Sequence, residues 1–154
     1  MVSKAATPVV KAATRGLAPV RLGRMPDPVV VPLDQVPVIP AAEAVTKVRI
    51  ARTITRARCG SELMQGVCWM DPGEKTNTWS SLATDDTAPG DHWYGPVEET
   101  YFIVRGDLRL TTDAGVFELH ANDSVYLAPG HTYELENVGS EPAFFVYSMT
   151  PSQE

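Results

Sequence analysis

The sequence predicts an all-β protein folded as an antiparallel sandwich or barrel. From residue 47 onward, short runs of strand-forming residues alternate with turn signals such as Asp-Pro-Gly and Pro-Gly, and no long segment has a helical period. A hydrophobic fraction of 44% over 154 residues suits a single core with an extension. Strands are expected at residues 47–57, 62–70, 76–82, 99–105, 108–112, 116–120, 123–128, 132–137 and 143–149.

The first forty residues have a different composition from the rest. They hold seven of the thirteen prolines and are otherwise rich in Ala and Val. Proline fixes φ and lacks an N–H donor, so an extended backbone is expected here. We therefore divide the chain into an extended arm, residues 1–40, and a single β-barrel domain, residues 41–154. Within the arm, residues 29–31 are the best candidate for an edge strand. A disordered tail and a targeting segment remain alternatives to a packed arm.

Charge divides the chain in two. Residues 1–58 carry ten Lys and Arg against three acidic residues, a net +7, whereas residues 59–154 carry three against sixteen, a net −13. An acidic body disfavours nucleic-acid binding, which requires a basic surface. The basic front half could lie on the acidic body of its own or of a second subunit. Alternatively, both are solvated surfaces that do not meet.

The cysteines and the hydropathy bear on location. Two cysteines, Cys59 and Cys68, are too few for a disulfide scaffold, and we interpret them as reduced thiols in a cytoplasmic protein. No apolar run approaches the ~20 residues needed to span a membrane. We expect neither a membrane nor a nucleic acid as a partner.

Candidate site residues gather in two stretches, residues 91–107 and 122–137. Because positions i and i+2 of a strand share a face, His92 and Tyr94 should point the same way, as should Glu99 and Tyr101. Glu98 should then face away from Glu99.

These stretches resemble the two motifs of a single-domain cupin. Six residues separate Glu99 from Gly106, as in the first motif, and His92 sits at its first histidine position, with Tyr94 at the second. In the second motif Asp123, Gly130 and Asn137 fall in register, but Tyr133 stands where the metal-binding histidine belongs. Trp93, the Gly-Asp-Leu at 106–108 and residues 130–135 are also similar to ethanolamine-utilisation cupins, which lack the usual histidine set.

A second alignment to the first motif stays open. Counting from Gly73 places Trp79 and Ser81 at the histidine positions, so that residues 82–97 become an inserted loop that carries His92.

The resemblance implies a small double-sheet jelly roll, a double-stranded β-helix, which in typical members holds Fe, Mn, Ni, Cu or Zn through three imidazoles and a carboxylate. Here it assigns His92, Glu99 and His131 as metal ligands. It assigns Tyr94, Tyr133 and Glu99 to catalysis, and Trp93, Tyr101 and Arg109 to substrate binding. One or two imidazoles with mostly protonated phenols are a poor set of ligands for a divalent ion, so a metal-bound site and a metal-free site both stay open.

Each residue also has a purely structural interpretation. His92 could cap a turn in a loop, Glu99 could be bonded to a tyrosine inside the barrel, and His131 could be exposed after its Pro-Gly turn. Arg109 could pair with nearby acidic residues instead of a substrate.

Two functions follow as hypotheses. The first is a metal-dependent lyase, isomerase or dioxygenase acting on a small organic acid or carbonyl compound. The second is a metal-free cupin that binds a ligand or acts as an accessory protein, with its tyrosines in a hydrogen-bonded cluster. In either case the resemblance and the arm predict a homodimer with arm exchange.

Overall fold

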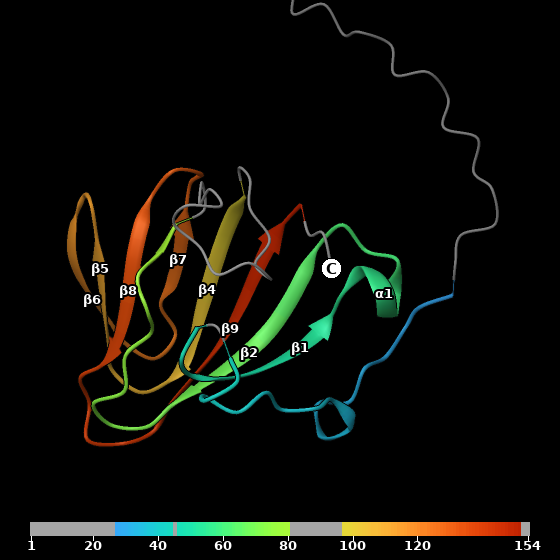
Figure 1. Ribbon diagram of the computed structural model, residues 1–154, viewed down its shortest axis with the longest axis horizontal. Coiled ribbons are helices and arrows are strands. Elements are labelled where there is room, and N and C mark those ends of the chain that lie inside the picture. The colour runs from blue at the N-terminus through green and yellow to red at the C-terminus, as the bar shows by residue number, and fades with distance from the viewer. Residues whose placement is uncertain (1–26, 45, 81–96, 152–154) are drawn as a thin grey trace, which may run out of the picture.

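The computed structural model describes residues 27–44, 46–80 and 97–151 of the chain (Figure 1). Strands dominate this part. In chain order its elements are η1 (Leu33–Gln35), β1 (Arg49–Ile54), α1 (Arg56–Cys59), β2 (Met64–Met70), β3 (Trp79–Ser80), β4 (Glu98–Arg105), β5 (Leu108–Thr112), β6 (Gly115–Leu119), β7 (Ser124–Leu127), β8 (Thr132–Asn137) and β9 (Ala143–Thr150).

The strands form two antiparallel sheets with a common core between them. One sheet has the order β1-β2-β9-β4-β7 and the other has the order β3-β8-β5-β6. Their inward side chains belong to one buried cluster, with Ile103 and Phe145 from the first sheet and Leu108 and Leu135 from the second. This arrangement confirms the expected all-β jelly-roll fold.

The first strand is shorter than its sequence pattern suggested. Strand was expected over residues 47–57, but β1 ends at Ile54 because Thr55 begins a helix. The Thr55 side chain accepts a hydrogen bond from the backbone N–H of Arg58, and Gly60 ends the helix in the left-handed conformation (φ 66°).

The segment before β1 packs against the five-stranded sheet. Val36 is buried with Ala51 and Val67 on the outer face of that sheet. Ile39 exchanges two backbone hydrogen bonds with Ile50, at 2.8 and 3.2 Å. Thus part of the predicted arm contributes to the packed structure.

The expected edge pairing at residues 29–31 is wrong. Val29 and Val30 are 56% and 85% exposed, and no strand forms there. Prolines at positions 28 and 32 bracket these valines and remove the N–H donors that a ladder needs. The pairing with β1 is made by Ile39 instead.

Position 106, the glycine of the first motif, requires glycine for a conformational reason. Gly106 has φ 94°, and a Cβ there would lie 2.6 Å from the Cα of Ala143. A side chain would therefore collide with backbone, which cannot move aside easily. Gly106 begins the β4–β5 connection, through which the chain passes from one sheet to the other.

The asparagine of the second motif holds two turns in place. Asn137 is 1% exposed, and its Nδ2 donates to the carbonyls of Met70 and Glu141, both at 2.9 Å. Its Oδ1 accepts from the N–H of Gly139 at 3.0 Å. Every polar atom of this buried amide side chain thus has a backbone partner.

In the part of the chain that the structure describes, no helix has the length and apolar character needed to cross a membrane.

Candidate functional site

The site is built around Glu99, near the start of β4. The burial pattern of β4 alternates, so that Glu99, Tyr101 and Ile103 face the core while Glu98 and Thr100 face outward. Glu99 is only 4% exposed. The predicted opposition of Glu98 and Glu99 is confirmed.

Two tyrosines partner this carboxyl group. Tyr133, the second residue of β8, comes from the opposite sheet and donates a short hydrogen bond from its hydroxyl to Oε2 of Glu99. The Tyr101 and Tyr133 rings meet edge to face, with centroids 6.4 Å apart and planes at 71°. Tyr101 meets Phe145 in the same manner at 5.4 Å. We call Glu99, Tyr101 and Tyr133 the carboxyl–phenol cluster.

Burial sets the electrostatics of the cluster. It raises the pKa of Glu99 to about 7, and the hydroxyls of Tyr133 and Tyr101 oppose that rise by hydrogen bonding. Burial also raises the pKa of both phenols well above the ordinary value, and the neighbouring groups add to it. The phenols therefore stay protonated at neutral pH, while Glu99 is poised between its acid and its carboxylate.

A neighbouring part of the same sheet was not predicted from the sequence: Tyr147 on β9 is the cross-strand partner of Tyr101. Tyr147 lies over Gly66, where a Cβ would come within 2.4 Å of its hydroxyl oxygen. Burial raises the pKa of Tyr147 and also that of the Cys68 thiol, which is 2% exposed. A glycine inside the strand-like run 62–70 was the available signal, because such a glycine often marks a close approach.

The structure gives His131 a partner away from the cluster. Its Nδ1 lies 2.9 Å from Oδ1 of Asp113, which also accepts from the N–H of Thr132 at 3.2 Å. The hydrogen bond from His131 lowers the pKa of Asp113. His131 is 37% exposed by side chain, so its predicted role as a metal ligand finds no support in this contact.

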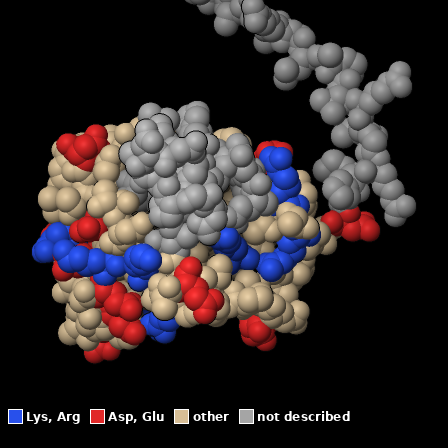
Figure 2. All heavy atoms as spheres, viewed as in Figure 1, with Lys and Arg blue, Asp and Glu red and all other residues tan. Residues whose placement is uncertain are grey.

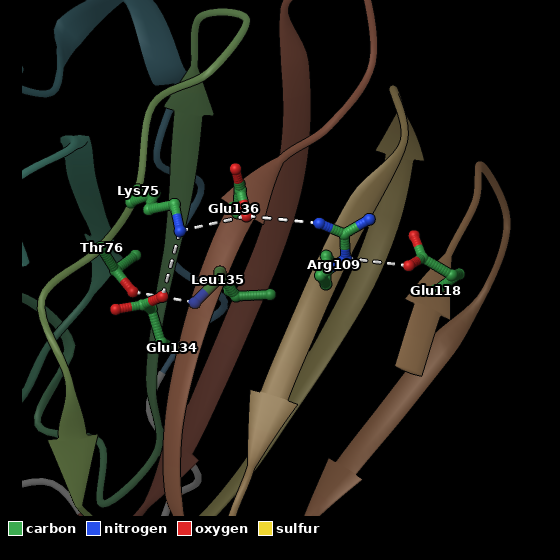
Figure 3. Close-up of polar contacts among 7 residues, drawn as sticks. All are labelled: Lys75, Thr76, Arg109, Glu118, Glu134, Leu135 and Glu136. Carbon is green, nitrogen blue, oxygen red and sulfur yellow. Dashed lines mark hydrogen bonds and ion pairs between the residues drawn. The ribbon is translucent and has the colours of Figure 1, made fainter. Parts of the chain in front are cut away.

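Arg109, predicted to bind substrate, lies on the outer face of the four-stranded sheet. Its Nε is 2.9 Å from Glu118, and its guanidinium also lies 3.6 Å from Glu136 (Figure 3). The structural interpretation of Arg109 therefore describes its contacts better than the substrate-binding one.

The remaining predicted residues, His92, Trp93 and Tyr94, lie outside the described residues. Trp79, which the second alignment places at the first histidine position, belongs to β3, whose backbone pairs with β8 at Tyr133. The described part of the chain thus supplies Glu99, Tyr101 and Tyr133 to one place.

These residues do not make a metal site by themselves. Among the described residues, no group of three or more His, Cys, Asp or Glu side chains is arranged to hold a metal ion. The neighbours of Glu99 are protonated phenols, which are weak ligands compared with imidazoles.

A cavity of about 320 Å³ lies beside the cluster. Three of its lining residues are cross-strand partners of cluster members: Leu127 pairs with Glu99, Val125 with Tyr101 and Thr112 with Tyr133. Most of the lining is apolar, and His131 is one of its few polar groups. Such a volume and lining are typical of a site for a small organic molecule. The full set of lining residues is Leu110, Thr112, Ala114, Phe117, Leu119, Ser124, Val125, Tyr126, Leu127 and His131.

Comparison with known proteins identifies this architecture. The family model of the cupin domain matches residues 79–149. A predicted oxalate decarboxylase from Thermotoga maritima has a similar structure, with a TM-score of 0.61, 14% identity and coverage of 80% of this chain and 99% of that one. The Schizosaccharomyces pombe Cnp3 cupin domain is also similar, with a TM-score of 0.58, 16% identity and coverage of 79% of this chain and 72% of that one. For a putative ethanolamine utilization protein Q from Salmonella typhimurium, the TM-score is 0.52 and the identity 16%, with coverage of 69% of this chain and 71% of that one.

No curated protein matches the chain significantly. At 14–16% identity the structural likeness shows the fold alone. The domain match, with the motif residues Glu99, Gly106 and Asn137 inside it, identifies residues 79–149 as a cupin domain.

Proposed function

We propose that the chain binds a small, mostly apolar organic molecule inside the barrel, with the carboxyl–phenol cluster as its polar centre. The observation that carries the proposal is the burial of Glu99, at 4% exposure, against phenols that belong to two different sheets. A buried carboxyl group is costly to the fold, and groups with such shifted pKa values concentrate at functional sites.

The chemistry of the cluster favours a ligand that accepts hydrogen bonds. A protonated Glu99 and the hydroxyls of Tyr101 and Tyr133 can all donate, whereas an anionic ligand would be repelled once Glu99 ionises. The neighbouring cavity is mostly apolar. A small carbonyl compound, with one acceptor oxygen on an apolar body, combines both properties.

Ligand binding can be tested by thermal shift with a panel of small aldehydes and ketones. Val125→Phe should fill the cavity and abolish any stabilisation by the ligand, while Val38→Phe, at a valine that is 51% exposed, should keep it. Glu99→Gln should weaken the stabilisation only for ligands that accept a hydrogen bond from the acid. Equal stabilisation of the wild type and Val125→Phe by every compound that binds would contradict the cavity as the site.

A second candidate is the metal-dependent enzyme of lyase, isomerase or dioxygenase type, acting on a small organic acid or carbonyl compound. It is favoured by the position of Glu99, which is that of the carboxylate in the cupin motif and which faces the interior. His92 and Glu99 would hold the metal, together with His131 or Tyr133. The Thermotoga maritima neighbour, named a predicted oxalate decarboxylase, supports this class, and the ethanolamine-utilisation neighbour supports the accessory class.

Metal content decides between the two candidates. Mass spectrometry on tag-free protein, wild type beside His92→Ala and Glu99→Gln, should find no stoichiometric Fe, Mn, Ni, Cu or Zn if the metal-free proposal holds, even after reconstitution. About one metal ion per chain in the wild type, lost in both variants, would favour the enzyme instead.

We further infer a cytoplasmic location. Its support is that Cys59 and Cys68 are unpaired, and Cys68 is buried.

A further inference from the structure

The cavity beside the carboxyl–phenol cluster opens at one edge of the sandwich. In the described sheets, β6 is the last strand of the four-stranded sheet and β7 is the last strand of the five-stranded sheet, and both line the cavity. Phe117 on β6 belongs to the inward set, because its partner Leu110 and its strand neighbour Leu119 are both buried. Phe117 is nevertheless 49% exposed. Solvent thus reaches an inward side chain between β6 and β7, and a ligand can enter there.

Charged side chains lie outside this cavity. Its described lining residues include no Lys, Arg, Asp or Glu. On the outer face of the four-stranded sheet, Nζ of Lys75 lies 3.2 Å from Oε2 of Glu136. On the same face, Nε of Arg109 lies 2.9 Å from Oε1 of Glu118. Figure 2 shows basic and acidic atoms beside each other on the side where Figure 1 places β5, β6 and β8. These charges pair at the surface, and the cavity suits an uncharged ligand.

His131 supplies the polar end of the cavity. Its Nδ1 lies 2.9 Å from Oδ1 of Asp113, and the same oxygen accepts a hydrogen bond from the backbone N–H of Thr132 at 3.2 Å. A carboxylate beside Nδ1 favours the neutral tautomer in which Nδ1 carries the hydrogen and Nε2 is the acceptor. Because His131 lines the cavity, Nε2 is the acceptor that it can offer to a ligand there.

Two other polar side chains of the lining already have partners. Oγ1 of Thr112 accepts a hydrogen bond from the N–H of Ala114 at 3.0 Å and donates to the carbonyl of Gly115 at 3.2 Å. The hydroxyl of Tyr126 donates to Glu98 at 3.2 Å. These hydroxyls are therefore less suited than the imidazole to bind a polar group of the ligand.

His131 and the carboxyl–phenol cluster lie at the same end of the barrel. Strand β7 begins at Ser124 and ends at Leu127, the cross-strand partner of Glu99, and His131 follows Leu127 after a turn. Tyr133, which donates to Glu99, comes two residues after His131. Two residues of extended chain span at most about 7 Å. A molecule about the size of one ring can therefore contact His131 and the cluster together.

We propose that the cavity binds a small hydroxy ketone, whose carbonyl oxygen lies at the carboxyl–phenol cluster and whose hydroxyl donates to His131. The inference rests on the proposed function, because it takes the carbonyl-binding cavity as given, and it adds the group that His131 selects. The cluster donates hydrogen bonds and the imidazole accepts one, so the two ends match a molecule with one acceptor and one donor. A cavity of about 320 Å³ with mostly apolar walls has room for the compact body between them.

Three cyclohexanones that differ in one substituent test this selection. 4-Hydroxycyclohexanone can donate to His131, whereas 4-methylcyclohexanone and 4-methoxycyclohexanone cannot. Apolar walls alone would favour the methyl compound. Isothermal titration calorimetry at about pH 7 should instead give a Kd about 10-fold lower for the hydroxy ketone than for either analogue, because an analogue without the donor leaves the imidazole unpaired.

Matched histidine variants identify the selecting residue. His131→Leu should reduce the ratio of the two Kd values, methyl over hydroxy, from about 10 to about 1 or less, whereas a general disturbance of the cavity would weaken both ketones alike. His120→Leu makes the same change at a histidine that also has an aspartate beside it, with Nδ1 3.7 Å from Oδ2 of Asp123. His120 is not among the described lining residues, so this variant should keep the preference. Circular dichroism would verify that each variant is folded.

The outcomes separate this inference from the proposed function. Equal binding of the hydroxy and methyl ketones by the wild type would overturn the selection by His131 and leave the carbonyl-binding cavity standing. A preference that persists in folded His131→Leu would do the same. Binding of all three ketones that is unchanged in Val125→Phe would overturn both, and so would the absence of binding by every ketone up to about 10 mM.

Discussion

The two ends of strand β8 differ in the partners that they give to a buried polar group. At its last residue the amide of Asn137 is matched, atom by atom, to backbone groups of three other residues. Near its start Tyr133 donates to Glu99, a buried acid whose pKa is raised to about 7. Among the described residues, Asn137 and Glu99 are the buried side chains that are polar or charged.

The comparison teaches which motif residue serves the fold and which serves the site. A neutral amide bonded to fixed backbone groups stabilises the fold at every pH. A buried acid held by side-chain hydroxyls costs stability once it ionises. We therefore interpret Asn137 as a structural residue and keep Glu99 as the candidate functional residue.

The largest loss of stability is expected when Asn137, at the end of β8, is substituted. Asn137→Ala leaves the carbonyls of Met70 and Glu141 and the N–H of Gly139 without their partner in a buried place. The free energy of unfolding should fall by about 3–5 kcal/mol, equally at low and high pH. Urea unfolding measures it. A loss below about 1 kcal/mol would show that water replaces the amide and would remove the contrast with Glu99.

The next effect is the pH dependence that Glu99 imposes. Its pKa is raised in the folded chain from 4.5 to about 7, so the folded chain binds more protons than the unfolded chain between these values. The contribution of Glu99 to the free energy of unfolding should thus be fully present below about pH 4.5, and roughly 3 kcal/mol should be lost as the pH rises through about 7.

Glu99→Gln should remove this fall, because the amide does not ionise. Urea unfolding of both proteins at about pH 5, 6, 7 and 8 compares the two slopes, and the variant should be the more stable protein at the high end. Parallel slopes would mean that Glu99 is not the titrating group.

A smaller effect should follow the loss of one hydroxyl. Tyr133→Phe removes the hydrogen bond to Oε2 of Glu99 and should cost about 1 kcal/mol near pH 5, where the acid is neutral, and about 2 kcal/mol near pH 8, where the bond is charge-assisted. The same unfolding series measures it. A loss that is independent of pH would indicate that Tyr133 contributes only packing.

The smallest effect on stability is expected for Tyr126 and Glu98, a tyrosine–glutamate pair on the surface. Tyr126 donates to Glu98 at 3.2 Å, and both residues are exposed. Tyr126→Phe should leave the pH dependence of unfolding unchanged, because water solvates Glu98 in place of the phenol. A pH-dependent loss equal to that of Tyr133→Phe would show that burial is not what distinguishes Glu99.

The sequence predicted those features that depend on local pattern. The shared face of Glu99 and Tyr101, opposite to Glu98, follows from the two-residue period of a strand, and the need for glycine at position 106 is consistent with its motif. Most strand positions were predictable for the same reason. Thr55 begins a helix inside an apparent strand, and residues 76–78 of the strand expected at 76–82 are not strand, since β3 begins at Trp79.

Contacts between distant segments could not be predicted in this way. The pairing of His131 with Asp113 depends on how two turns lie beside each other, and the pairing of Arg109 with Glu118 and Glu136 depends on strand register. Tyr147 reaches Gly66 only because β9 and β2 are neighbours in the sheet. Such contacts follow from topology, which the spacing of residues along the chain does not specify.

The segment that precedes β1 has a practical consequence for anyone who shortens this protein. Strand β1 is the edge of its sheet, and Ile39 occupies backbone groups there that would otherwise be open to another chain. A truncated chain that starts at residue 41 lacks both Ile39 and Val36, so the backbone edge of β1 and an apolar patch become exposed to solvent. Aggregation of such a fragment would then result from the exposed strand edge and not from the loss of residues 1–26. A deletion that tests the basic residues 1–26 should therefore end before residue 27.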